Sequence, residues 1–155
     1  MRILLVAVGK LRPALREVAD DYLRRVTRSL ALDEREVREA GRQPAGVQRQ
    51  DEEDRRILRL IPAGMPVTLL DPGGTPLTSE EVAARIAAWR LAAQDRAIVI
   101  GGANGVGAAL HHRADERWSL GPITLPHELA RVVVLEQLYR GTTILQGTPY
   151  HRGDA

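Results

Sequence analysis

The sequence predicts an α/β fold with a mostly parallel sheet and helices on both faces. Short apolar segments alternate along the chain with segments of helical periodicity, which is the pattern of parallel α/β domains. The apolar runs around Val67 and Ile98 are nearly continuous, as in strands that are buried on both faces. With 155 residues, of which 44% are hydrophobic, the chain is expected to form one domain over residues 1–155.

In the first half of the chain, strands and helices are expected to alternate, and a proline and a glycine are expected to end the last of these helices. In order, these are a strand at 2–8, a helix at 13–26, an edge strand at 32–40, a mobile loop at 41–48 and a helix at 49–60. Pro13 suits the first turn of its helix because proline needs no hydrogen-bond partner there. Pro62 and Gly64 end the second helix.

The second half repeats the alternation with stronger boundary signals. In order, it is expected to contain a strand at 66–71, a turn at 72–77, a helix at 78–93, a strand at 96–100, a short helix at 107–115, a strand at 117–120 and a last helix at 128–140. Thr78 and Glu81 have the spacing of a capping box, which marks the start of the third helix.

The amino-acid composition limits the types of functional site that the protein can have and its expected location in the cell. The chain has no cysteine, which excludes disulfides, thiolate metal sites and a cysteine nucleophile. No apolar run is long enough to cross a bilayer and the start lacks a signal-peptide cleavage region, so a cytoplasmic protein without a membrane partner is expected. Arginine supplies nearly all of the basic residues, in clusters at 24–28 and 55–59. These clusters fit either a solvated helix face or phosphate contact with a nucleic acid.

Three loops rich in glycine or proline follow predicted strands: "LLDPGG" (69–74), "IGGANG" (100–105) and "SLGPITLPH" (119–127). Ligands of open parallel sheets bind at the carboxyl ends of the strands. An ordinary tight turn explains the glycine and proline residues of any one of these loops. Three such loops after successive strands favour a pocket for a small molecule. The glycine spacing does not fit the dinucleotide fingerprint, and no lysine follows as in a Walker phosphate loop. An oxidoreductase with a nucleotide cofactor is therefore the weaker alternative.

Candidate catalytic side chains are few. His111 and His112 are adjacent on a predicted surface helix and no carboxylate has metal-site spacing, so no metal is expected. His151 is flanked by Tyr150 and Arg152 near the end of the chain, just after a proline. Chain ends are usually dispensable, so this triplet is either ordinary tail or a set of groups that the fold delivers to a site.

Several motifs together resemble the RlmH family of SPOUT-class methyltransferases. They are "LLVAVGK" (4–10), "LLDPGG", "IGGANG", "WSLGPITLPHELARVVVLEQLYR" (118–140) and "PYHR" (149–152), in order along nearly the whole chain. The resemblance implies a SPOUT fold with a carboxyl-terminal trefoil knot, a homodimer, and S-adenosylmethionine as the methyl donor. It also implies the reaction, which is methylation of N3 of a pseudouridine in 23S ribosomal RNA, with the assembled ribosome as the expected partner.

The resemblance further implies which residues contact the cofactor. Carried over position by position, they are Leu70, Gly102, Gly121, Pro122, Ile123, Thr124, Leu125 and Pro126. All eight lie in the three loops described above. The chain departs from the family pattern in the glycine loop, at 121–122, at Thr142 and at Gly147.

Tyr150, His151 and Arg152 are the expected catalytic residues. N3 of pseudouridine carries a proton at neutral pH, so the site needs a proton acceptor and donors to the negative charge that develops on the imide oxygens. His151 is expected to handle the proton, Arg152 to donate to the anion or to a phosphate, and Tyr150 to stack on or position the base. Two alternatives stay open: a tail that only binds RNA, or a non-catalytic ribosome-binding protein that retains the fold.

Overall fold

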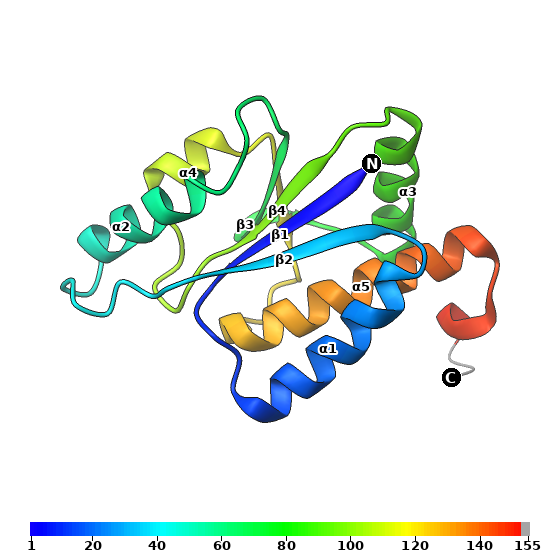
Figure 1. Cartoon of the computed structure of the whole chain (residues 1–155), viewed down its shortest axis with the longest axis horizontal. Coiled ribbons are helices and arrows are strands. Elements are labelled where there is room, and N and C mark those ends of the chain that lie inside the picture. The colour runs from blue at the N-terminus through cyan, green and yellow to red at the C-terminus, as the bar shows by residue number, and fades with distance from the viewer. Residues whose placement is uncertain (153–155) are drawn as a thin grey trace.

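The computed structural model describes residues 1–152 and shows a five-stranded sheet between two layers of helices (Figure 1). The strands are β1 (Arg2–Val8), β2 (Ala31–Val37), β3 (Val67–Pro76), β4 (Arg96–Ile100) and β5 (Glu116–Ser119). They lie in the order β2-β1-β4-β3-β5, and each recorded strand pairing is parallel. The predicted α/β fold with a mostly parallel sheet is confirmed.

Helices cover both faces of the sheet, as predicted. In residues 1–152 they are α1 (Pro13–Thr27), α2 (Val47–Leu58), α3 (Ser79–Leu91), α4 (Ala108–Arg113), α5 (His127–Gln146) and the 3-10 helix η1 (Pro149–Arg152). Successive side chains of a strand point to opposite faces. Ile3 and Leu5 of β1 therefore pack with α1, α3 and α5, while Val6 and Val8 pack with α2 and α4.

The parallel pairing brings all carboxyl ends of the strands to one end of the sheet. The segment 69–74 of β3 and the loops that follow β4 and β5 lie there on neighbouring strands, because β3 lies between β4 and β5. α5 starts at this end, runs back along the sheet and carries η1 at its far end (Figure 1). The trefoil knot stays a prediction.

β3 is longer than predicted, and the expected turn at 72–77 is wrong in its second half. Trp118 of β5 pairs with Leu70 and again with Thr75, so residues 71–74 form a bulge and β3 then continues to Pro76. A Cβ on Gly74 would lie 2.7 Å from the carbonyl carbon of Arg117, so only glycine lets the two backbones approach. Proline and glycine therefore signal a bulge here, not the end of the strand.

α5 extends to Gln146, six residues beyond the predicted end at 140. Gly141 lies within the extension, although glycine weakens helices. In the structure a Cβ on Gly141 would lie 2.8 Å from Cδ1 of Ile86, so glycine allows close packing of α5 on α3. Gly147, with a φ of 69°, ends the helix. No helix of residues 1–152 is long and apolar enough to span a membrane.

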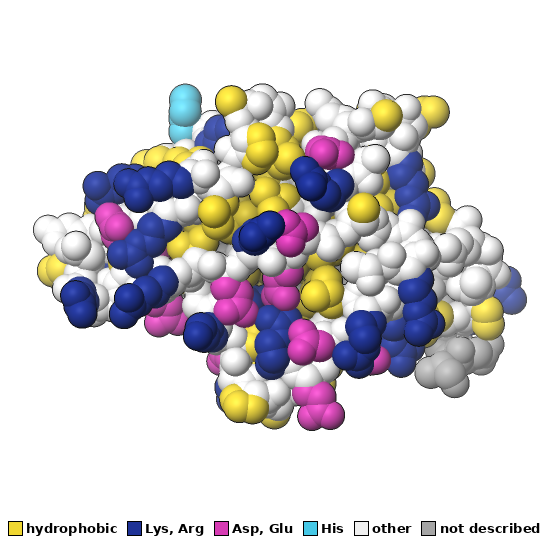
Figure 2. Space-filling model, viewed as in Figure 1, with side chains coloured by type: hydrophobic (Ala, Val, Ile, Leu, Met, Phe, Trp, Pro, Cys, Tyr) yellow, Lys and Arg dark blue, Asp and Glu magenta, His cyan; other side chains and the backbone are white. Residues whose placement is uncertain are grey.

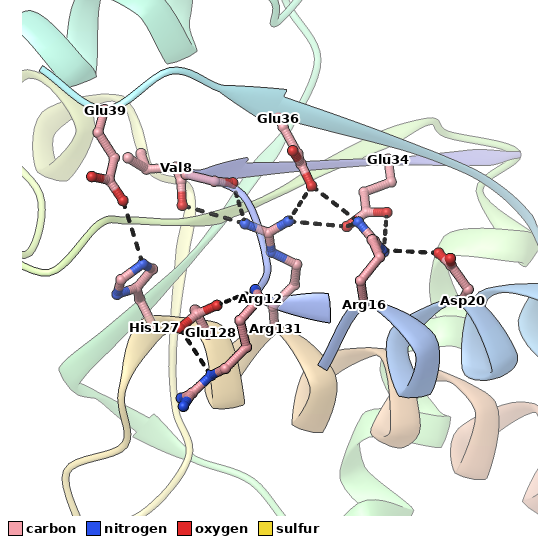
Figure 3. A network of polar contacts seen from close by, with 11 residues as sticks. Val8, Arg12, Arg16, Asp20, Glu34, Glu36, Glu39, His127, Glu128 and Arg131 are labelled. Carbon is pink, nitrogen blue, oxygen red and sulfur yellow. Dashed lines mark hydrogen bonds and ion pairs between the residues drawn. The ribbon is translucent and has the colours of Figure 1, made fainter. Parts of the chain in front are cut away.

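A buried arginine fixes the first turns of α5 to the carboxyl ends of β1 and β2 (Figure 3). Arg131 is 1% exposed and donates to the carbonyl oxygen of Gly9 at 2.7 Å and to Oε1 of Glu36 at 2.9 Å. Its guanidinium also contacts Glu34 at 3.3 Å. The loop at 121–126 leads directly into this anchored helix, so the network holds one side of the predicted cofactor site.

Replacing Arg131 by methionine should lower the free energy of unfolding by about 3 to 5 kcal/mol, because Glu36 and Glu34 would lose their buried cation. Arg16 contacts the same two carboxylates from α1, and its side chain is 28% exposed. The matched Arg16→Met variant should therefore cost only about 1 kcal/mol. Urea unfolding of both variants checks the prediction, and equal losses would contradict it.

Candidate cofactor loops and carboxyl-terminal tail

The glycine loop after β4 folds back on itself and packs closely against neighbouring elements. Gly102 and Gly105 form an isolated bridge, and Gly105 has a φ of 74°. A Cβ on Gly102 would lie 2.9 Å from Cγ1 of Val8 and 3.1 Å from Oε2 of Glu53. Gly102 therefore lies directly against β1 and α2, with no room for a side chain on that side.

Two buried acids of α2 support this loop. Asp54 is 1% exposed and accepts hydrogen bonds from the backbone N–H groups of Gly107 at 2.9 Å and Leu110 at 3.0 Å, which caps the start of α4. Glu53 is 3% exposed and accepts from the N–H of Ala40 at 3.0 Å. These bonds hold the glycine loop and the segment after β2 on the same helix.

The loop at 121–126 is mostly exposed. Gly121 has a φ of 107°, and its N–H donates to Oγ of Ser119 at 3.2 Å. Ile123 is 74% exposed, an unusual position for a large apolar side chain. Gly121 also lines a hollow of about 330 Å³ between β5 and α5. Pro122, Thr124 and Pro126 are exposed, and Leu125 is half-buried.

Leu70 lies at the end of the first paired part of β3 and packs against the core under α1, α3 and α5. The next residue, Asp71, fixes the bulge through Oδ1, which accepts from the N–H of Gly73 at 3.0 Å. Burial alone would raise the pKa of Asp71, but the Gly73 bond and the nearby His111 and Arg117 lower it overall. The carboxylate therefore stabilises the bulge at neutral pH, and this contribution disappears as the pH falls through the lowered pKa.

The tail triplet lies in η1 and packs on α5. The Tyr150 hydroxyl donates to Oε1 of Glu136 at 3.2 Å and lies 3.3 Å from the hydroxyl of Tyr22. Its ring centroid is 4.6 Å from that of Tyr139 and 4.9 Å from the guanidinium carbon of Arg140. Burial and the two hydroxyl contacts raise the pKa of Tyr150, so the phenol stays protonated at neutral pH.

His151 is half-buried, and Arg152 is exposed. Within residues 1–152, Nδ1 of His151 is buried and has no hydrogen-bond partner. A polar atom that is buried without a partner costs free energy, so this nitrogen does not stabilise the described part of the chain through a hydrogen bond. Gly153, Asp154 and Ala155, which the sequence suggested as a frayed end, lie outside the described residues.

The structure brings the three cofactor loops to one end of the sheet but places the tail elsewhere. α5 has 20 residues, so His127 and Gln146 lie about 30 Å apart along the helix axis. Tyr150 reaches back only to Glu136, which is still about 15 Å along α5 from Pro126. Within one chain, the predicted catalytic residues therefore do not lie beside the loop at 121–126.

Sequence reasoning missed the supporting residues Glu53, Asp54 and Arg131. Each occupies a position of an apolar helical stripe: Asp54 precedes Ile57 by three residues, and Arg131 precedes Leu135 by four. A charged residue inside such a stripe is the signal that could have identified them, because burial of a charge requires partners.

Comparisons with known proteins agree with this arrangement. A family model described as "Predicted SPOUT methyltransferase" matches residues 1–151. Proteins named "Ribosomal RNA large subunit methyltransferase H" are similar over almost the whole chain. One from Methylobacterium sp. (strain 4-46) is 45% identical, with 99% of each chain covered. One from Gemmatimonas aurantiaca is 44% identical, covering 98% of this chain and 100% of the relative. One from Xanthomonas campestris is 40% identical, covering 98% and 99%.

Three observations agree and are sufficient to classify the protein: the family match, the similarity over almost the full length, and the parallel sheet with its loops. The chain belongs to the SPOUT methyltransferase family and, within it, to the family of ribosomal RNA large subunit methyltransferase H.

Proposed function

We propose that this chain is a methyltransferase of the large-subunit ribosomal RNA that uses S-adenosylmethionine to methylate N3 of a pseudouridine in 23S rRNA. The observation that carries the proposal is 45% identity over 99% of the chain to a protein named for rRNA methylation. The expected substrate is the assembled ribosome, and the expected working unit is a cytoplasmic homodimer.

The three loops suit this cofactor. Residues 70–74, 101–106 and 121–126 contain neither lysine nor arginine, so they offer backbone groups where a phosphate ligand would call for cations. Nothing lies within 4 Å of the position of a Cβ on Gly121, which leaves space beside that loop. Leu70, Gly102 and residues 121–126 would hold the cofactor, which supplies an electrophilic methyl group when bound.

Replacing Gly102 by valine should weaken S-adenosylmethionine binding at least about tenfold, because the new side chain displaces the loop from Val8 and Glu53. The matched control is Gly41→Val, since Gly41 has open space at its Cβ position and a φ outside the left-handed region. Isothermal titration calorimetry of the two variants, with thermal melting as a fold check, tests this. Equal affinities would remove Gly102 from the cofactor site.

The tail provides the polar groups that transfer to N3 requires. His151 would accept the N3 proton on a ring nitrogen, which leaves N3 with the electron pair that it needs to take a methyl group. Arg152 donates hydrogen bonds to the imide oxygen on which negative charge develops. Tyr150 is a hydrogen-bond donor and stacking group, because its raised pKa keeps the phenol protonated.

A second copy of the chain supplies this tail to the cofactor loops. The length of α5 separates the two parts within one chain, whereas an antiparallel dimer can place the tail of one protomer beside the loops of the other. Each composite site would then need both protomers.

Mass spectrometry of 23S rRNA tests the proposed function. Ribosomes that lack the methyl group are incubated with the protein and cofactor, and one pseudouridine should gain a single methyl group at N3. Binding of cofactor and ribosomes without any methyl gain would instead support a non-catalytic ribosome-binding protein.

A further inference from the structure

Six arginines surround α2 and the segment that precedes it. They are Arg38, Arg42, Arg49, Arg55, Arg56 and Arg59. In the sequence this region looks electrically balanced, because Asp51, Glu52, Glu53 and Asp54 stand in the same helix. Figure 2 shows Lys and Arg side chains gathered at the end of the molecule that carries α2.

Folding separates the two signs of charge. Glu53 and Asp54 are buried and bind the backbone N–H groups of Ala40, Gly107 and Leu110, so they do not face the solvent. Their removal from the surface leaves an excess of cations on the outer side of α2. The two acids thus stabilise the loops from inside, while Arg38, Arg42 and Arg59 are exposed to the solvent.

An open groove of about 1290 Å³ runs beside these arginines. It starts at Gly9 and Lys10 after β1 and is lined by Arg38, Arg42 and Arg56. Arg56 donates to the carbonyl oxygen of Arg38 at 2.8 Å, which holds the segment after β2 against α2. The groove therefore has a fixed wall.

Three acids line the groove. Within residues 1–152, Glu36 and Glu52 form ion pairs with arginines, Glu39 is 58% exposed, and two of the groove's arginines have no carboxylate partner. Glu36 binds Arg131 and Arg16, and Glu52 binds Arg56 and Arg55. Glu39 lies 3.9 Å from His127. By contrast, within residues 1–152 neither Arg38 nor Arg42 has a carboxylate within ion-pair distance; both side chains are exposed.

We propose that this groove binds phosphates of 23S rRNA beside the nucleotide to be methylated. The proposal rests on the proposed function for its substrate. Exposed arginines in a groove suit the negative charge of RNA, because each guanidinium binds a phosphate through paired hydrogen bonds. The helix α2 supplies Glu52 and Arg56 to the groove, and its Gln50 side chain donates to the carbonyl oxygen of Asn104, so the groove and the glycine loop contact the same helix. RNA held there leads directly to the cofactor loops.

The test compares Arg38→Ala/Arg42→Ala with the matched control Arg2→Ala/Arg85→Ala. Arg2 and Arg85 lie on β1 and α3, away from the groove, and each forms a surface ion pair. Both double variants remove the same charge. Filter binding to 23S rRNA is measured over a range of salt concentrations, together with the KM for ribosomal subunits and the affinity for S-adenosylmethionine.

The groove variant should bind rRNA about tenfold more weakly than the control, and its log–log salt slope should fall by about two because two phosphate contacts are lost. Its affinity for the cofactor should not change. Equal rRNA binding and equal salt slopes in the two variants would overturn the groove proposal even if the wild type methylates rRNA. Arginine-dependent rRNA binding by a wild type that transfers no methyl group would support the groove and refute the proposed function.

Discussion

Replacing His151 by alanine is expected to slow single-turnover methyl transfer by about two to four orders of magnitude, which is the usual contribution of a positioned proton acceptor. Cofactor affinity should stay unchanged, because the three loops are assigned to the cofactor and His151 to the N3 proton of the RNA. The assignment comes from the chemistry that N3 requires and from the tail motif; within residues 1–152, Nδ1 of His151 makes no hydrogen bond that would commit the ring to a structural contact. Rapid quench with saturating ribosomes and labelled cofactor measures the rate.

Two further variants separate proton transfer from RNA binding. His151→Gln keeps hydrogen-bonding capacity but cannot accept the proton, so it should be as slow as His151→Ala. His112→Ala removes an exposed histidine of α4 and should leave the rate unchanged. A rate for His151→Gln close to that of the wild type would mean that the tail only binds RNA.

Mixing two inactive variants is expected to restore about a quarter of the wild-type activity per protomer. One variant carries His151→Ala in the tail, and the other carries Gly102→Val in the glycine loop. On random mixing about half of the dimers are mixed, and each mixed dimer has one site with an intact loop and an intact tail. The expectation follows from the separation of loop and tail by α5.

A site contained within one chain gives the opposite result, because every protomer of every mixture would carry one defect. Methyl incorporation into ribosomes is therefore measured after co-refolding the two variants at equal amounts. Persistent inactivity of dimers shown to be mixed would refute the composite site. The separately purified variants, combined without refolding, control for contamination by wild type.

Most of the secondary structure was predictable from local patterns. β4 has the predicted bounds, Arg96–Ile100, and the capping box of Thr78 and Glu81 starts α3 as expected. These signals are local: a run of apolar residues, or two side chains that bind the backbone within one turn. The turn predicted at 72–77 was wrong because the effect of its glycines depends on what lies next to them, and α5 passes its predicted end through Gly141, which packs against Ile86.

The candidate cofactor loops were also accessible from sequence, since alternating strands and helices place the loops after parallel strands at one end of the sheet. The family resemblance supplied the individual residues, such as Leu70 and Gly102. Periodicity could not identify the residues that hold these loops in place. Asp54 and Glu53 resemble surface acids until their backbone partners on other segments are known.

By itself, the sequence determined the order of strands and helices, the α/β class and the three loops, because these follow from periodicity and short-range hydrogen bonding. Only the tertiary structure decided which charges are buried and where the tail lies. Burial of Arg131 and Asp54 depends on carbonyl and N–H groups far away in the chain. The position of His151 depends on the full length of α5, which continues past Gly141 because Ile86 of α3 packs against it.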